Sequence, residues 1–190
     1  MLVDWYSKRM LNRFRLNARE TEAIQLNDAR RVAILFDASE VQNIKPVKKL
    51  VSLLVSNGHK VAALGYVDLP YKSFEHMSVL HLDYFDKNQL NWYGKPKGMV
   101  IDNFLEDKYD ILLDLSTKSH YPLTYLSLAL SARYKVGRFR KDISIFDLEI
   151  KIKQSQCIKS LIKKVSHCLI PTEGYENKFR KDWRSLNYPI

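Results

Sequence analysis

Two aspartates, Asp37 and Asp114, have the residue type and the spacing that chemistry at a sheet edge requires. Each follows a short apolar run, RVAILF and YDILL, and such runs are typical of strands buried on both faces. Open α/β sheets bind ligands at the carboxyl ends of their strands. Two carboxylates facing across a crevice could bind a metal, hold a ribose, or act as acid and base. The alternative is that each aspartate caps a helix or forms a turn.

A polar loop follows Asp114 and precedes a predicted helix that starts near residue 122. Ser116 and Lys118 lie in this loop. A helix N-terminus can hold an anion through its backbone N–H groups, and Lys118 would add positive charge. The alternative is that Ser119 or its neighbours cap the helix. The two interpretations are compatible.

The loop after the first strand, DASEVQNIKP, contains Ser39 beside Asp37 but no glycine. NAD and FAD sites need glycines there, and the phosphate-binding pattern GxxxxGK[ST] is absent as well. The five histidines are scattered, and no zinc-site spacing is present. A nucleophilic pair of Ser116 and His120 remains open, although no GxSxG turn surrounds the serine. The sequence therefore predicts no metal and no cofactor.

Residues 92–97, WYGKPK, mix aromatic and basic side chains. Nucleic-acid-binding proteins often stack bases on aromatic residues beside lysines, and the alternative is a loop whose aromatic side chains cover the sheet edge. The third strand should run parallel to the first, so this loop should leave it on the ligand side. We therefore predict that Lys95 and Lys97 lie near the mouth of the crevice between Asp37 and Asp114.

Alternating apolar strands and amphipathic helices predict a single α/β domain over residues 1–170 with a Rossmann-like three-layer fold. We expect strands at 31–37, 61–67, 79–82, 111–115, 134–139 and 145–150, and helices at 44–54, 99–106, 122–130 and 158–169. Residues 85–98 should form a loop. The chain crosses back after the third strand, which predicts a mostly parallel sheet of five or six strands in the order 3-2-1-4-5-6. Asn43 should cap the helix whose first turn contains Pro46. Residues 171–190 should form a partly ordered tail.

The chain is basic, with a formal net charge of +10. Residues 1–19 predict an extra amphipathic helix whose basic side includes Lys8, Arg9, Arg13 and Arg15. This helix could bind RNA, a membrane surface or a partner, or it could dock on the sheet with its basic side in solvent. From residue 133 onward, fourteen lysines and arginines face six acidic residues. Such a balance favours acidic partners such as nucleic acid, anionic lipid or phosphorylated ligands, and the alternative is that the charge only keeps the protein in solution.

Cys157 and Cys168 are the two cysteines, and both fall on one predicted helix. Eleven residues of helix separate them by roughly 16 Å, too far for a disulfide. We expect them to be small buried side chains in a reducing compartment. The N-terminal residues lack the apolar region of a secretory signal, and no apolar run reaches the roughly 20 residues of a membrane span. The sequence therefore predicts a cytoplasmic protein.

The blocks LNWYGKPK, YDILLDLS and KVGRF, together with VAILFDAS, LGYVD, PLTYLSLAL and FDLEI, resemble a family of uncharacterised single-domain proteins from Bacteroidota. This resemblance covers nearly the whole chain except the last twenty residues and implies no catalytic residue. Residues 109–139 are also similar to the N-terminal Rossmann-like half of heptosyltransferase-type glycosyltransferases. Those enzymes bind the sugar nucleotide mainly with a second domain, for which this chain has no room. That likeness therefore supports the fold and not a transferase activity.

Three functions follow as hypotheses. The first is a cytoplasmic, non-catalytic binding protein for RNA or a ribonucleoprotein, because the chain is basic and lacks a complete catalytic motif. The second is an enzyme or sensor that binds a nucleotide or phosphosugar at the crevice. The third is a subunit that only scaffolds other proteins. The oligomeric state is left open by the sequence.

Overall fold

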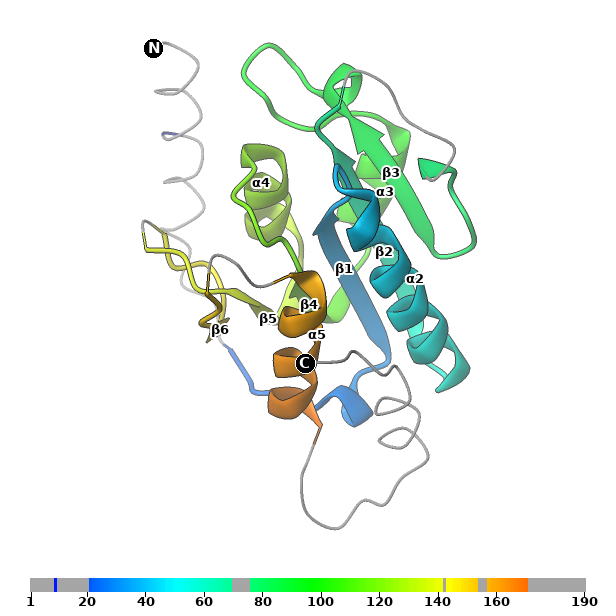
Figure 1. Cartoon of the computed structure of the whole chain (residues 1–190), viewed down its shortest axis with the longest axis vertical. Helices are drawn as coiled ribbons and strands as arrows, with labels where there is room; N and C mark the ends of the chain where they lie inside the picture. Colours follow the sequence, from blue (N-terminus) through cyan, green and yellow to red (C-terminus); the bar gives the residue numbers. More distant parts are fainter. Residues whose placement is uncertain (1–8, 10–20, 70–75, 142, 154–156, 171–190) are drawn as a thin grey trace.

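Six parallel strands form one sheet in the order β3-β2-β1-β4-β5-β6 (Figure 1). The computed structural model describes residues 9, 21–69, 76–141, 143–153 and 157–170. The strands are β1 (Arg31–Asp37), β2 (Lys60–Val67), β3 (Leu82–Asp86), β4 (Tyr109–Asp114), β5 (Ala132–Arg138) and β6 (Leu148–Ile150). The predicted α/β fold and strand order are thus confirmed.

Helices cover both faces of the sheet. On one face lie α2 (Val41–Ser56) and α5 (Ile158–Leu169), and on the other lie α3 (Met99–Glu106) and α4 (Tyr121–Ala129). Two short 3-10 turns, η1 (Leu26–Asp28) and η3 (Lys87–Gln89), complete the order of elements.

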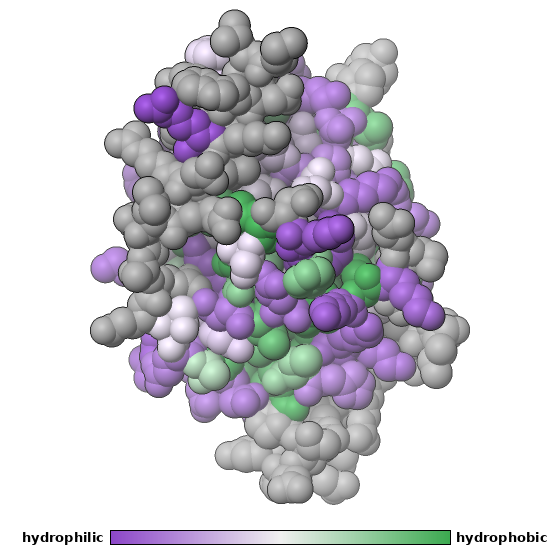
Figure 2. All heavy atoms as spheres, turned by 90° about the vertical axis from the view of Figure 1, so that its left-hand side faces the viewer, coloured by the Kyte–Doolittle hydropathy of each residue, from purple (hydrophilic) through white to green (hydrophobic). Residues whose placement is uncertain are grey.

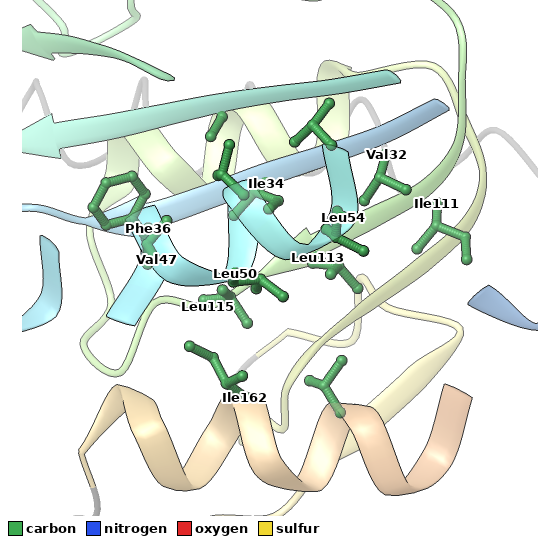
Figure 3. Close-up of a cluster of buried hydrophobic side chains, with 14 of the residues drawn as sticks. Val32, Ile34, Phe36, Val47, Leu50, Leu54, Ile111, Leu113, Leu115 and Ile162 are labelled. Carbon is green, nitrogen blue, oxygen red and sulfur yellow. The ribbon is translucent and has the colours of Figure 1, made fainter. Parts of the chain in front are cut away.

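The central strand β1 shows why its sequence has no polar interruption. Its residues Val32, Ile34 and Phe36 pack beneath α2 and α5 (Figure 3), whereas Ala33 and Leu35 pack beneath α3 and α4. Successive side chains of a strand point to opposite faces, and here both faces are covered by helices. Every position must therefore be apolar until the strand reaches the edge of the sheet.

The third strand was predicted too early in the chain. Val79 makes only an isolated antiparallel bridge with Leu82, and β3 begins at Leu82. Between them, His81 has a φ of 68°, in the left-handed region that turns the chain. Residues 85 and 86, expected in a loop, belong to this strand.

The helix after β1 also begins earlier than predicted. α2 starts at Val41 with Glu40 as its N-cap, so Asn43 lies in the first turn and is not the cap. The Asn43 amide instead donates a hydrogen bond to the backbone oxygen of Asp37 at 3.1 Å. Pro46 consequently lies in the second turn, where the helix loses one backbone hydrogen bond.

The two cysteines lie at the two ends of α5. Cys157 and Cys168 are free and exposed, so the expectation that they are buried is wrong. Cys157 precedes α5 and Cys168 lies in its last turn, on the side away from the sheet. The predicted N-terminal helix and C-terminal tail lie outside the described residues, apart from the exposed Arg9. No helix in the described ranges is long and apolar enough to cross a membrane.

Candidate functional site

The two predicted aspartates lie together at the carboxyl ends of two neighbouring strands. Asp37 ends β1 and Asp114 ends β4, and in these parallel neighbours Leu35 pairs with Asp114. Both side chains are buried, with 2% and 1% of their surface exposed. Leu35 and Leu112 belong to the core beneath α3 and α4. Because strand residues alternate between the two faces, both carboxylates point to that face. Asp37 lies two residues further along its strand than Leu35, the partner of Asp114.

Asp37 accepts hydrogen bonds from two loops. Its Oδ1 accepts from the backbone N–H of Ser39 at 3.0 Å, and its Oδ2 lies 3.1 Å from Nε2 of His120. Burial by itself raises the pKa of this carboxyl, but the hydrogen bonds from His120 and Ser39 outweigh it, and the net pKa is lowered. The surroundings of Asp37 therefore favour its ionised form.

His120 stands between two carboxylates just before α4. Its ring packs against the ring of Tyr66, with centroids 5.5 Å apart. Nε2 faces Asp37, and Nδ1 lies 4.0 Å from Oδ2 of Asp68. The Tyr66 hydroxyl donates to the other Asp68 oxygen at 3.1 Å, and the Ser39 hydroxyl accepts from the Asp68 backbone N–H at 2.8 Å. We name these five residues the switch-point cluster.

Asp114 is held by a different set of partners. Its Oδ2 accepts hydrogen bonds from the Arg140 guanidinium and from the Ser127 hydroxyl, both at 2.8 Å, and its Oδ1 accepts from the Ser116 N–H at 2.9 Å. Arg140 is 7% exposed and also donates to the Thr124 hydroxyl. This buried ion pair joins β4, α4 and the segment after β5. We name Asp114, Thr124, Ser127 and Arg140 the buried anchor.

The polar loop before α4 only partly matches its prediction. Ser116 is fully buried, and its hydroxyl has no hydrogen-bond partner among the residues that the structure describes. Lys118 is exposed and forms an ion pair with Glu40, so the loops after β1 and β4 meet at one place as expected. Ser119 does not cap α4, because the helix begins at residue 121 and the N-cap position belongs to His120.

Lys95 and Lys97 lie in the loop that packs against α4. The Lys95 ammonium lies 5.5 Å from the centre of the Tyr125 ring, and Gly94, with a φ of 86°, lies against Tyr121. Lys97 is exposed. Within the described ranges, no hydrogen bond or ion pair joins either lysine to the switch-point cluster, so their position at its mouth stays a prediction.

The charges around the switch-point cluster are nearly balanced. Lys118 pairs with Glu40, and the Lys87 ammonium lies 3.0 Å from Asp68. Both lysines are therefore engaged with carboxylates, and the cluster offers hydrogen-bonding groups rather than a surplus of positive charge. No group of three or more His, Cys, Asp or Glu side chains in the described part of the chain could hold a metal ion.

Five residues of these networks were missed by the sequence reasoning: Tyr66, Asp68, Thr124, Ser127 and Arg140. Asp68 follows β2 at the same sheet edge, and its position directly after a strand is the signal that had already selected Asp37. Arg140 follows β5 by two residues, so its proximity to this edge could have been inferred from topology. Ser127 lies within the apolar stripe of α4 and carries no such signal.

A second feature is the unequal charge of the two helical layers. The helices α2 and α5 contain no aspartate, glutamate or arginine, and six lysines: Lys45, Lys48, Lys49, Lys159, Lys163 and Lys164. We name this set the lysine face. The opposite layer, α3 and α4, contains Asp102 and Glu106 but no lysine or arginine.

Seen from the β6 side, hydrophilic side chains cover most of the described surface, with smaller hydrophobic areas between them (Figure 2).

A cavity of about 200 Å³ lies between the first half of β2 and α3. Ala62, Leu64 and Phe104 contribute apolar side chains to it, and Asp83 and Asp107 contribute carboxylates. It lies toward the amino ends of the strands, away from the switch-point cluster.

The fold follows from the structure, and one comparison with known proteins names a family. The sheet order and its switch point between β1 and β4 define a Rossmann-like α/β domain. Residues 3–169 match the model of a family of unknown function, DUF6913, and the chain belongs to that family. No curated protein and no solved structure matches the chain.

Replacing Arg140 with Met should lower the free energy of unfolding by about 3–5 kcal/mol, because it leaves the buried Asp114 carboxylate without its cation. Urea unfolding measures this loss. Arg133→Met is the matched control, since its ion pairs with Glu22 and Asp110 are exposed and should contribute less than about 1 kcal/mol. The double variant Asp114→Asn with Arg140→Met should recover part of the loss. A loss for Arg140→Met no larger than for Arg133→Met would contradict the assignment.

Replacing Asp37 with Asn should destabilise the protein at pH 7 by about 1–3 kcal/mol, because hydrogen bonds to the charged carboxylate are lost. The pKa of Asp37 is lowered in the folded state. Its contribution is therefore present above the unfolded-state value near 3.9 and is lost as the pH falls through the lowered folded-state value. The stability deficit of the variant should thus shrink below about pH 4. Urea unfolding across this range, with the exposed Asp102→Asn as control, tests the prediction, and a deficit that stays constant with pH would refute it.

Proposed function

We propose that this protein is a non-catalytic binding protein for RNA or a ribonucleoprotein, acting in the cytoplasm through the lysine face. The observation that supports the proposal is the composition of α2 and α5, which together carry six lysines and no carboxylate. Of these lysines, Lys45, Lys49, Lys159 and Lys163 are exposed. Positive charge gathered on one layer attracts a polyanion more strongly than the same charge interspersed with carboxylates.

The remaining charge of the chain also favours a polyanionic partner. The formal net charge is +10, and Lys151 and Lys153, between β6 and α5, are exposed as well. We expect Lys8, Arg9, Arg13 and Arg15 to add to the attraction for a polyanion.

We also expect the relatives of this chain to come from Bacteroidota.

The triple variant Lys45→Gln, Lys49→Gln and Lys163→Gln should weaken RNA binding on the order of tenfold or more at low salt and make its salt dependence shallower, because fewer counterions are released. The matched control is Lys60→Gln, Lys108→Gln and Lys141→Gln, three exposed lysines outside both helices. Each triple variant lowers the formal net charge from +10 to +7. Fluorescence anisotropy with labelled RNA measures the affinity, and circular dichroism checks the fold. Equal weakening by both variants, or no RNA binding by the parent protein, would overturn the proposal.

A second candidate function is an enzyme or sensor that binds a nucleotide or phosphosugar at the switch-point cluster. The observation that favours it is His120, which is hydrogen-bonded to Asp37 and has its other nitrogen 4.0 Å from Asp68. A histidine oriented by a carboxylate can take up or donate a proton. The buried hydroxyl of Ser116, which no described residue satisfies, lies at the end of the neighbouring strand.

Thermal-shift measurements with nucleoside mono-, di- and triphosphates and sugar phosphates test this candidate, because a ligand that binds only the folded state raises the melting temperature. We expect His120→Asn to abolish such a shift. His81→Asn is the matched control. His81 lies directly before β3, at the amino ends of the strands and away from the cluster, and asparagine tolerates its φ of 68°. Asp114→Asn is less informative, because it breaks the buried anchor. A shift that survives His120→Asn, or no shift with any of these ligands, would count against the site.

A further inference from the structure

The four exposed lysines of the lysine face form two short rows of positive charge. Lys45 and Lys49 lie one helical turn apart on the exposed side of α2, and Lys159 and Lys163 are spaced in the same way on α5. Four residues rise about 6 Å along a helix. The two helices share one buried cluster on the same face of the sheet (Figure 3), and helices packed side by side have axes roughly 8–10 Å apart.

We infer that the lysine face binds the two phosphodiester backbones of double-helical RNA; this inference rests on the RNA-binding function proposed above. Two neighbouring helices that each carry a row of cations can engage the two phosphate rows that border a groove, and the wide, shallow minor groove of A-form RNA presents both backbones to a protein surface. A single strand presents one row of phosphates and engages only half of this face. Ser52, exposed three residues after Lys49, adds a hydroxyl on the same side, where it can reach a ribose 2′-OH.

The side chains that single strands need are absent from these helices. Proteins that bind single-stranded nucleic acid stack the bases on aromatic residues. Neither α2 nor α5, both described over their whole length, contains a phenylalanine, tyrosine or tryptophan. In the rest of the described chain, the exposed aromatic residues Trp92 and Phe139 lie in the segments after β3 and β5. The lysine face therefore contacts the backbone without reading bases.

An anionic membrane is the other polyanion that a lysine-rich face could meet. Helices that bind membrane surfaces bury a broad apolar face in the lipid. The apolar sides of α2 and α5 are already used against the sheet, and Val41 is their one exposed large hydrophobic side chain. The face thus lacks the apolar surface that would anchor it in lipid.

The experiment compares three probes with the same protein. The first is an RNA duplex of about 20 base pairs, long enough to span two grooves. The second is one of its strands, chosen so that it does not pair with itself, and the third is a vesicle containing phosphatidylserine. Anisotropy titrations at about 50–200 mM salt give the RNA affinities and their salt slopes, and sedimentation gives the vesicle-bound fraction. The full-length protein and the two triple-lysine variants are used throughout.

We expect the duplex to bind at least about tenfold more tightly than the single strand, and this preference to shrink in the triple variant of the lysine face but not in its control. Equal or tighter binding of the single strand, with the same dependence on Lys45, Lys49 and Lys163, would overturn the inference and leave the proposed RNA-binding function intact. Binding of neither RNA would overturn the proposed function itself. Vesicle binding without RNA binding would overturn both and assign the face to lipid.

Discussion

The ion pair between Asp114 and Arg140 is the interaction on which the arrangement of the sheet edge depends. The helix α4 contains no charged residue of its own and packs on the sheet through apolar side chains such as Leu123 and Leu126. Its polar contacts to β4 and to the segment after β5 add direction to this packing. Asp114 accepts from Ser127, and Arg140 donates to Thr124. Burying two charges is costly unless each finds good partners, and losing one partner is costlier still. The anchor therefore specifies one position for α4 rather than adding a large net stability.

That position determines what Asp37 can do. Lys135 is buried, and its ammonium donates a hydrogen bond of 2.6 Å to the Ser127 carbonyl, near the C-terminal end of α4. With both ends of the helix held, the residue that precedes it, His120, is brought to Asp37. Two aspartates at the same edge thus differ in role: Asp114 is used to hold a helix, whereas Asp37 meets a titratable ring. Neighbouring positions on adjacent strands were enough to give them different partners.

Much of the fold could be predicted from the sequence because local patterns determine it. Apolar runs mark the strands, and the rules for parallel crossovers then order them. The pairing of Asp114 with Arg140 could not be predicted in this way. The two residues are 26 positions apart, and an arginine in the segment GRFRK looks the same whether it is buried or solvated. The third strand was misplaced for a related reason: residues 79–82 have the apolar pattern of a strand, but the turn at His81 interrupts it.

The two candidate sites lie on opposite faces of the sheet, and this separates their chemistry. The Asp37 carboxylate points to the layer of α3 and α4, whereas the lysine face belongs to α2 and α5. A macromolecule on the lysine face therefore does not compete for space with a small ligand beside His120. Any coupling between the sites must pass through the packed core or around the strand end. Two direct links lie at the strand end: the hydrogen bond from Asn43, in the first turn of α2, to the backbone oxygen of Asp37, and the ion pair between Glu40, the N-cap of α2, and Lys118. A shift of α2 would therefore act on Asp37 through its backbone, and on the end of β4 through Leu113 and Leu115, which share the apolar cluster of α2.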